Sequence, residues 1–383
     1  MTTILPAPDT AGRVSIGYPG ATDVDFAELA PLMGRKLLNN VGDPYVDGIG
    51  TGHTKAAERQ VVEIIADLFR AGDDRWGYVT TGATEGNLWA LREARRRYPD
   101  GLVIHTTAAH YSVPKAIDLL AMPSVVVAAD DRGEMDYTDL RRKVTRHRDR
   151  PVIIAATAGT TMTEAVDDLH QITAVLDDIG VTGRYLHVDA ALAGIPLALL
   201  EPDQRPGFDL ADGADSIVVS GHKFFGAPMP CGVLVTTAAA PTQASVSYIG
   251  SPDTTITGSR NGHAPLILRS ALQRHGLTGL RTRAEHAREL AAHTLNRLTE
   301  IRWPAWRHPH AFTVVLDRPP PPAVAARWSI PTENRRSHIV CMPGLTQHDL
   351  DRFINDLRNA TRRQRRAIPR QRQPATGYRT GNP

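Results

Sequence analysis

Short apolar runs rich in β-branched residues alternate with segments of helical period over much of the chain. The runs predict strands at Gly77–Thr80, Leu102–His105, Ser124–Ala128, Val152–Thr157, Tyr185–Val188, Ser216–Ser220 and Gly232–Thr236. The segments between them predict helices at Val61–Arg70, Glu85–Tyr98, Asp139–Arg146 and Leu169–Ile179. Several strands are apolar without alternation, as expected when helices cover both faces of a parallel sheet. The pattern therefore predicts an α/β fold with a mostly parallel sheet.

The pattern changes near residue 275. The later elements are expected to be a long helix at Leu277–Ile301, strands at Phe312–Leu316 and His338–Met342, and a helix from Gln347 to about Arg366. These form an α+β set that is separate from the first. We expect an N-terminal arm over residues 1–50, a large domain over 51–275, a small C-terminal domain over 276–366 and a disordered tail over 367–383.

The charge of the chain is divided unevenly. The 44 basic and 41 acidic residues give a net charge of +3, which alone would favour an acidic partner. From Arg358 onward the chain holds eight arginines and no acidic residue; the remainder, with 36 basic and 41 acidic residues, carries −5. The basic balance therefore belongs to the tail. Lysines are few, at positions 36, 55, 115, 143 and 223.

The cysteine content and the hydropathy of the chain bear on its cellular compartment and on whether it enters a membrane. Two cysteines, Cys231 and Cys341, cannot form a disulfide framework, which favours a cytoplasmic protein. No secretory signal is visible at the N-terminus. The longest apolar stretch, Ala190–Leu200, contains Gly194 and Pro196 and is too short to span a bilayer. We therefore expect no membrane function.

Three motifs at predicted strand ends could carry chemistry. Thr80–Asn87 (TTGATEGN) joins a strand to a helix, so Gly82 allows a turn whose N–H groups could bind a phosphate. Asp189 directly follows an apolar strand, where open α/β sheets place ligand groups. Lys223 follows another such strand, where desolvation would favour a neutral amine. Each motif also has an ordinary structural explanation: a helix cap for the first two and a solvated loop lysine for the third.

Together the three motifs fit one cofactor. Pyridoxal phosphate needs a lysine to hold its aldehyde, an acid beside its ring nitrogen and a phosphate cradle. His110, after the strand at Leu102–His105, could stack on the ring. The combination predicts a pyridoxal-phosphate enzyme.

Several longer motifs resemble those of a known family. They are TTGATEGN, AHYSVPK, AGTTM, HVDAAL, SGHK and IGSPDTTITGSRNGHA, in this order along the chain. They are similar to motifs of the pyridoxal-phosphate group II decarboxylases, especially the bacterial histidine decarboxylases, and plant serine decarboxylases are similar too. The likeness runs from about Ile16 to about residue 275. It implies the aspartate-aminotransferase type of fold (fold type I) and decarboxylation of an L-amino acid to its amine and CO2.

The resemblance also implies a role for each matching residue. The catalytic set would be Lys223 binding the aldehyde, Asp189 pairing with the ring nitrogen and His110 stacking on the ring. Ala191 would pack on the opposite ring face and Thr160 would lie near a ring substituent. The phosphate would be held by Gly82, Ala83, Thr84, Ser220 and His222. Such proteins are usually homodimers, and the loop Ser251–Thr255 could reach the neighbouring site. Tyr111 and Tyr248 are candidates for the acid that protonates Cα, and each also suits a structural role.

Departures from the family pattern leave the substrate open. Ala83 stands where glycine is common, and Ala193 stands where serine is frequent in the histidine-acting members. Thr163 and Glu164 replace a common Lys-Gly pair. Histidine is therefore the leading substrate, with serine or a non-proteinogenic amino acid as alternatives. Other outcomes on the same cofactor are transamination and oxidative deamination to an aldehyde.

Two features of the sequence could suggest a function outside this chemistry. The arginine-rich tail could bind nucleic acid, but solvated helix surface explains basic faces more simply, and no aromatic residues are interleaved. His308–His310 (HPH) stands without a partner motif for zinc, so no metal site is expected.

Overall fold

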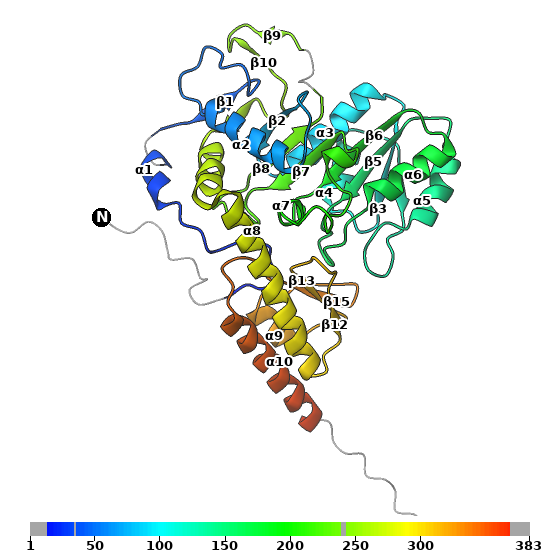
Figure 1. Ribbon diagram of the computed structural model, residues 1–383, viewed down its shortest axis with the longest axis vertical. Coiled ribbons are helices and arrows are strands. Elements are labelled where there is room, and N and C mark those ends of the chain that lie inside the picture. Colours follow the sequence, from blue (N-terminus) through cyan, green and yellow to red (C-terminus); the bar gives the residue numbers. More distant parts are fainter. Residues whose placement is uncertain (1–13, 34–35, 239–242, 368–383) are drawn as a thin grey trace, which may run out of the picture.

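A seven-stranded sheet forms the centre of the larger lobe in the computed structural model, which describes residues 14–33, 36–238 and 243–367 (Figure 1). Its strands lie in the order β2 (Trp76–Thr80), β8 (Gly232–Thr236), β7 (Ser216–Ser220), β6 (Arg184–Asp189), β5 (Val152–Thr157), β3 (Leu102–Thr106) and β4 (Ser124–Val127). Strand β8 is antiparallel to both of its neighbours, and the other neighbouring pairs are parallel. The predicted α/β fold is confirmed, and the seven strands predicted for this sheet agree to within one residue at each end. The later strand predicted at His338–Met342 lies two residues nearer the N-terminus, at Arg336–Val340.

Helices cover both faces of this sheet, which explains why its strands do not alternate. On one face, α3 (Ala83–Arg97) and α4 (Ser112–Leu119) pack on Val103 of β3 and Ile153 of β5. On the other face, the next residues of the same strands, Ile104 and Ile154, join a larger core. Among the helices that contribute to this core are α2 (Lys55–Leu68), α5 (Tyr137–Thr145), α6 (Leu169–Ile179) and α7 (Gly194–Ala198). Both sides of each central strand are therefore buried.

The long helix α8 (His263–Glu300) runs from the large lobe into the smaller one (Figure 1). It is interrupted at Gly276, whose φ of 57° and ψ of −178° are not helical. The sequence predicted only the part after this interruption. Gly276 lies at the predicted domain boundary, and the division into domains stays a prediction.

A four-stranded antiparallel sheet builds the smaller lobe. Its order is β12 (Ala305–Trp306), β13 (Thr313–Leu316), β15 (Arg336–Val340) and β14 (Thr332–Glu333). The helices here are α9 (Pro322–Arg327) and α10 (Gln347–Ala367). The predicted last helix is confirmed, and the tail from residue 368 lies outside the described residues.

The N-terminal segment lies against both lobes. The Ile16 N–H donates to the Trp328 carbonyl oxygen in the small lobe, and the Ala21 N–H donates to the Lys223 carbonyl oxygen in the large one. Two two-stranded ladders lie outside the main sheets: β1 (Asn39–Val41) with β11 (Ser259–Asn261), and β9 (Ser245–Val246) with β10 (Ser251–Pro252). Short helical turns occur at η1 (Ala27–Leu29), α1 (Ala30–Met33) and η2 (Leu210–Asp212). Among the described residues, no helix is long and apolar enough to cross a membrane.

Candidate active site

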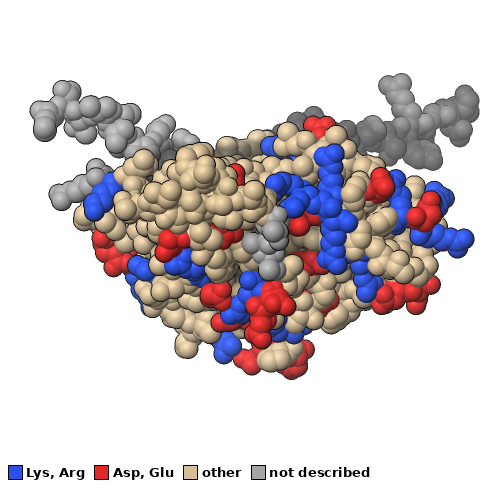
Figure 2. Space-filling model, turned by 90° about the horizontal axis from the view of Figure 1, so that it is seen from above, with Lys and Arg blue, Asp and Glu red and all other residues tan. Residues whose placement is uncertain are grey.

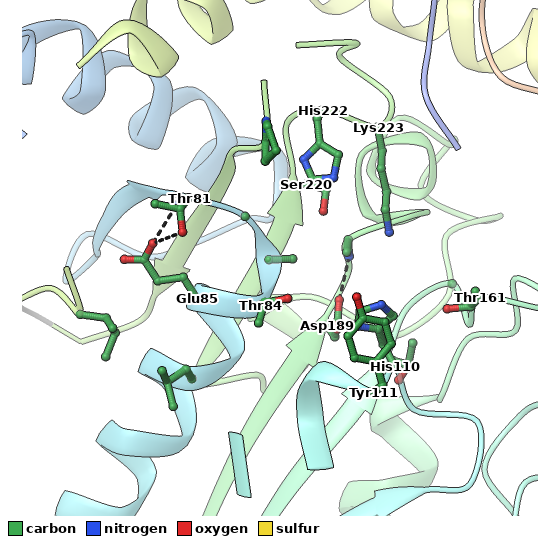
Figure 3. Close-up of a pocket in the computed structure, with 18 of the residues that line it drawn as sticks. Thr81, Thr84, Glu85, His110, Tyr111, Thr161, Asp189, Ser220, His222 and Lys223 are labelled. Carbon is green, nitrogen blue, oxygen red and sulfur yellow. Dashed lines mark hydrogen bonds between the residues drawn. The ribbon is translucent and has the colours of Figure 1, made fainter. Parts of the chain in front are cut away.

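A cavity of about 450 Å³ opens at the carboxyl ends of β6 and β7, beside the N-terminus of α3 (Figure 3). This is where an open, mostly parallel sheet places its ligand groups. All the predicted site residues except Thr160 line it: Gly82, Ala83, Thr84, His110, Asp189, Ala191, Ser220, His222 and Lys223. Residues from four separate motifs are thus brought together in one cavity.

The first turn of α3 forms one wall of the cavity. Gly82 precedes the helix with a φ of 152°, a backbone conformation that favours glycine. The N–H groups of Ala83 and Thr84 make no hydrogen bond to any described residue, so they remain available to an anion at this helix end. Glu85 does not compete for them, because its carboxylate accepts from the N–H and hydroxyl of Thr81 (Figure 3).

Lys223 follows β7 and its side chain extends into the cavity (Figure 3). Burial lowers the pKa of its amine, and the nearby Asp189 carboxylate partly opposes that shift. The backbone here is fixed, because the Lys223 carbonyl oxygen accepts from the N–H groups of Ala21 and Gly226. A desolvated amine on a rigid support is suited to attack a carbonyl carbon.

Asp189 is the last residue of β6 and is 3% exposed. Its side chain accepts a 2.7 Å hydrogen bond from Asn87 Nδ2 on α3 and a 3.1 Å bond from the Ala191 N–H. Two N–H donors therefore face the carboxylate oxygens, which accept both bonds. Asp189 can therefore serve as a fixed negative charge opposite Lys223.

His110 and Tyr111 form the rim opposite the helix end. Their ring centroids lie 4.1 Å apart, and Tyr111 is 65% exposed. Burial lowers the pKa of His110, so its imidazole is neutral near pH 7. Tyr248, the other candidate acid, lies elsewhere: it is 82% exposed and lines a separate cavity with His53 and Lys55.

Thr160 is the predicted site residue that does not line this cavity. Its hydroxyl lies 2.8 Å from the Thr163 hydroxyl and accepts from the Ala165 N–H. It lines an adjoining cavity of about 560 Å³, whereas its neighbours Gly159 and Thr161 line the first one. The motif AGTTM was therefore recognised correctly as part of the site, but Gly159 and Thr161, and not Thr160, line the cavity.

Sequence reasoning missed further lining residues. They are Thr81, Glu85, Leu88, Thr157, Gly159, Thr161, Pro230, Ile256 and Thr257. Most lie within or beside the motifs already noted, so they could have been found there. Ile256 and Thr257 also belong to a noted motif, IGSPDTTITGSRNGHA, but the sequence did not indicate that this motif reaches the cavity, and Pro230 lies outside the motifs.

Comparison with known proteins now identifies the family. Residues 27–301 match the pyridoxal-dependent decarboxylase conserved domain. The chain belongs to this family. The histidine decarboxylase of Mesorhizobium japonicum is 43% identical over 91% of this chain and 94% of its own length. Serine decarboxylase 2 of Oryza sativa subsp. japonica is 37% identical over 89% of this chain and 73% of its own.

The decarboxylase fold is matched in solved structures as well. L-Methionine decarboxylase from Streptomyces sp. 590, in complex with L-methionine methyl ester, superposes with a TM-score of 0.81. It is 27% identical and the match covers 90% of this chain and 91% of that one. This protein is therefore a pyridoxal-phosphate-dependent amino-acid decarboxylase, as its sequence motifs predicted.

The cavity of this decarboxylase suits the cofactor on its own geometry. A helix N-terminus with unpaired N–H groups, a buried lysine and a buried carboxylate surround one space. These match the phosphate, aldehyde and protonated ring nitrogen of pyridoxal phosphate. The residues present therefore fit the group.

Proposed function

We propose that the enzyme decarboxylates L-histidine to its amine and CO2. The support is the 43% identity to a histidine decarboxylase over nearly the whole of both chains. Further histidine decarboxylases, from Pseudomonas entomophila and Vibrio campbellii, are each 36% identical. Serine is the second candidate substrate, because the serine decarboxylases are similar at 34–37% identity.

The cavity residues are assigned roles by their chemistry. Lys223 would hold the aldehyde, and Asp189 would keep the ring nitrogen protonated. His110 and Ala191 would lie against the two ring faces. These roles are supported by the shared cavity and by the buried, hydrogen-bonded state of Asp189.

The remaining assignments concern the phosphate and a ring substituent. The turn at Gly82 and the N–H groups of Ala83 and Thr84, with the side chains of Ser220 and His222, would hold the phosphate; the Gly82 N–H itself donates to Thr80 Oγ1. Thr160 would act near a ring substituent only after a change in its present hydrogen bonds to Thr163 and Ala165.

The chemistry divides between the cofactor and the protein. The bound cofactor supplies an electron-accepting ring that stabilises negative charge at Cα when CO2 leaves. The protein would position the amino acid and hold the fixed groups, Lys223 and Asp189, in the same cavity. Tyr111, at the exposed rim beside His110, could hold a proton near Cα.

The active unit is proposed to be a homodimer. Loop residues 45–49 lie beside residues 248–250, since the Ile49 N–H donates to the Ile249 carbonyl oxygen. Ile49 is 69% exposed and Tyr248 82% exposed, with Tyr45 and Val46 also exposed. The face seen in Figure 2 includes a broad area without charged side chains. The exposed side chains of Ile49 and Tyr248 suit contact with a second copy of the chain.

The loop Ser251–Thr255 would contribute to that interface mainly through its neighbours. Ser251, Thr254 and Thr255 are buried within their own chain, and Thr254 donates to Asp43. The exposed part is the preceding segment with Tyr248. We therefore expect Tyr248 to approach the neighbouring site more closely than the loop itself.

A cytoplasmic location is proposed as well. Cys231 and Cys341 are buried and free. This is the usual state of cysteines in a reducing compartment.

The substrate proposal is tested by product analysis. The holoenzyme is incubated with all proteinogenic amino acids and related non-proteinogenic ones, and CO2, amine and aldehyde are measured. Release of histamine and CO2 in equal amounts, at the highest kcat/KM for L-histidine, supports the proposal. A higher kcat/KM for serine or another amino acid overturns it, as does aldehyde as the main product.

The dimer is tested by light scattering with size-exclusion chromatography. Ile49→Asp and Tyr248→Asp are expected to weaken self-association, whereas Leu277→Asp, which changes another exposed apolar residue, is a control. A monomeric wild-type protein with full activity would exclude the proposal.

A further inference from the structure

A continuous chain of hydrogen bonds lies behind the cavity, between the sheet and α3. Asn87 is at its centre: Nδ2 lies 2.7 Å from Asp189 Oδ2 and 2.8 Å from Ser112 Oγ, and Oδ1 lies 2.8 Å from His187 Nε2. Beyond His187, its Nδ1 lies 2.8 Å from Ser216 Oγ, which accepts from the Tyr185 hydroxyl at 3.0 Å. Each of these side chains is nearly or fully buried.

The direction of every bond in this chain follows from Asp189. An ionised carboxylate only accepts, so the amide nitrogen of Asn87 must face it and the amide oxygen must face His187. His187 then donates from Nε2 and accepts at Nδ1 from the Ser216 hydroxyl. Burial lowers the pKa of His187 to about 4, which agrees with a neutral ring having one proton.

The other branch leads from Asn87 to His110. Ser112 Oγ accepts from Asn87 Nδ2, so its own proton is free to be donated to His110 Nδ1, 2.7 Å away. The Ser112 N–H lies 3.3 Å from the same ring nitrogen. Two donors therefore face Nδ1, which must carry a lone pair. The single proton of the neutral ring is left on Nε2.

We propose that Ser112 and Asn87 are positioning residues that hold His110 with its proton on Nε2, presenting a fixed neutral N–H donor. The inference rests on the proposed function only in taking this cavity as the catalytic one. No described residue is hydrogen-bonded to His110 Nε2, so that N–H is available to the ligand. The Asn87 amide thus donates to Asp189 directly and, by donating to Ser112 Oγ, also orients the hydroxyl that faces His110 Nδ1.

A neutral donor differs in function from an imidazolium. It can hydrogen-bond to a substrate carboxylate without adding a positive charge, which would oppose loss of CO2 by stabilising the carboxylate. Asn87 has no titrating proton, so the chain sets geometry and does not relay protons between His110 and Asp189. The charge of Asp189 still acts on His110 through space: it raises the His110 pKa against the larger effect of burial, while Lys223 and Lys115 lower that pKa.

The tautomer is tested directly by NMR. Protein labelled with ¹⁵N-histidine is examined without cofactor and with it, and His110→Asn identifies the His110 signals. Near pH 7 we expect a protonated Nε2 and an unprotonated Nδ1. A proton on Nδ1, or an imidazolium, overturns the inference whether or not the enzyme acts on histidine.

The role of Ser112 is tested by variants. In Ser112→Ala, loss of the donor should raise the His110 pKa by about half a unit to one unit and move the acidic limb of the kcat/KM profile upward equally. Ser112→Thr keeps the hydroxyl and should restore the wild-type limb. Ser337→Ala removes a buried hydroxyl from the small lobe and should leave the limb unchanged.

These outcomes separate the inference from the substrate proposal. An unshifted limb and unchanged His110 NMR signals in Ser112→Ala would overturn the role of Ser112. If that variant does not fold, the Ser112→Thr profile and the wild-type tautomer still decide the inference. If the wild-type spectrum shows a protonated Nε2 but the enzyme prefers another amino acid, only the proposal that histidine is the substrate is refuted.

Discussion

The buried ion pair between Glu58 and Arg260 is expected to be a large determinant of stability. Arg260 Nη2 lies 3.1 and 2.9 Å from the two carboxylate oxygens of Glu58, and both side chains are at most 2% exposed. Glu58 also accepts from the Val79 N–H at 2.9 Å and from Asn40 Nδ2 at 2.8 Å. The pair therefore joins β11 to α2 and contacts β1 and β2 through these donors.

Arg260→Met removes the cation and leaves the carboxylate buried. Breaking such a pair costs about 3–5 kcal/mol. The Asn40 and Val79 donors still hydrogen-bond to the Glu58 carboxylate in this variant. We therefore expect a loss of about 3 kcal/mol in the free energy of unfolding, at the lower end of that range. Adding Glu58→Gln removes the stranded charge while keeping a hydrogen-bond acceptor. The double variant should therefore be more stable than Arg260→Met by about 1 kcal/mol or more.

The assay is urea unfolding of the apoprotein at pH 7, comparing midpoints among variants that share one m-value. Arg141→Met is the control, since Arg141 and Asp178 form a pair with side chains 46% and 63% exposed. An exposed pair is worth about 0–1 kcal/mol. If Arg260→Met costs no more than Arg141→Met, or Glu58→Gln further destabilises it, the account of a stranded charge is wrong.

Three further predictions concern the site and its support. Lys223→Ala should remove both the visible absorbance band of the bound cofactor and CO2 release. Because the pKa of His187 falls from 6.5 to about 4 in the folded protein, its neutral form favours folding above pH 6.5, and this contribution is lost as pH falls toward 4. His187→Gln lacks that dependence, so its stability deficit, measured by urea unfolding, should shrink by about 2 kcal/mol between pH 7 and pH 5. Gly276→Ala should cost about 1–3 kcal/mol of unfolding free energy, since a φ of 57° with a ψ of −178° is nearly restricted to glycine.

Each of these has a result that would contradict it. A visible band that survives Lys223→Ala would show that another residue binds the aldehyde. A His187→Gln deficit that is constant with pH would mean that the pKa of His187 is the same in the folded and the unfolded protein. Gly279→Ala, in the helical part of α8, is the control for Gly276→Ala, and equal stability of the two variants would mean that the interruption is not strained.

The strands were predictable because burial on both faces produces apolar runs of distinctive length. Val152–Thr157 was predicted at its observed limits for this reason. The antiparallel direction of β8 was not predictable, since a short apolar run has the same appearance in either direction. The start of α2 was also missed, because Lys55 and Glu58 resemble surface residues. Both side chains are fully buried. Lys55 donates to the Val46 carbonyl oxygen, and Glu58 forms an ion pair with Arg260.

The part of α8 before Gly276 was missed for a different reason. Pro265 lies in its first turn, where a missing N–H costs no helical hydrogen bond. From the sequence alone, Pro265 and Gly276 suggest loop on either side of a short segment. The observed helix depends on packing of Ile267, Leu268 and Ala271 into the core, which only the folded chain reveals.

Part of the site was likewise predictable from local sequence, whereas another part depends on how the helices pack on the sheet. The strand-end rule located Asp189 and Lys223, because the carboxyl ends of parallel strands meet at one edge of a sheet. Strand parity extends this reasoning: Tyr185, His187 and Asp189 are two residues apart on β6 and therefore face the same side. The rotation of α3 about its own axis is not determined by that parity. Since this rotation brings Asn87 between His187 and Asp189, and next to Ser112, the hydrogen-bond chain that orients His110 could be deduced only from the packed helix and sheet.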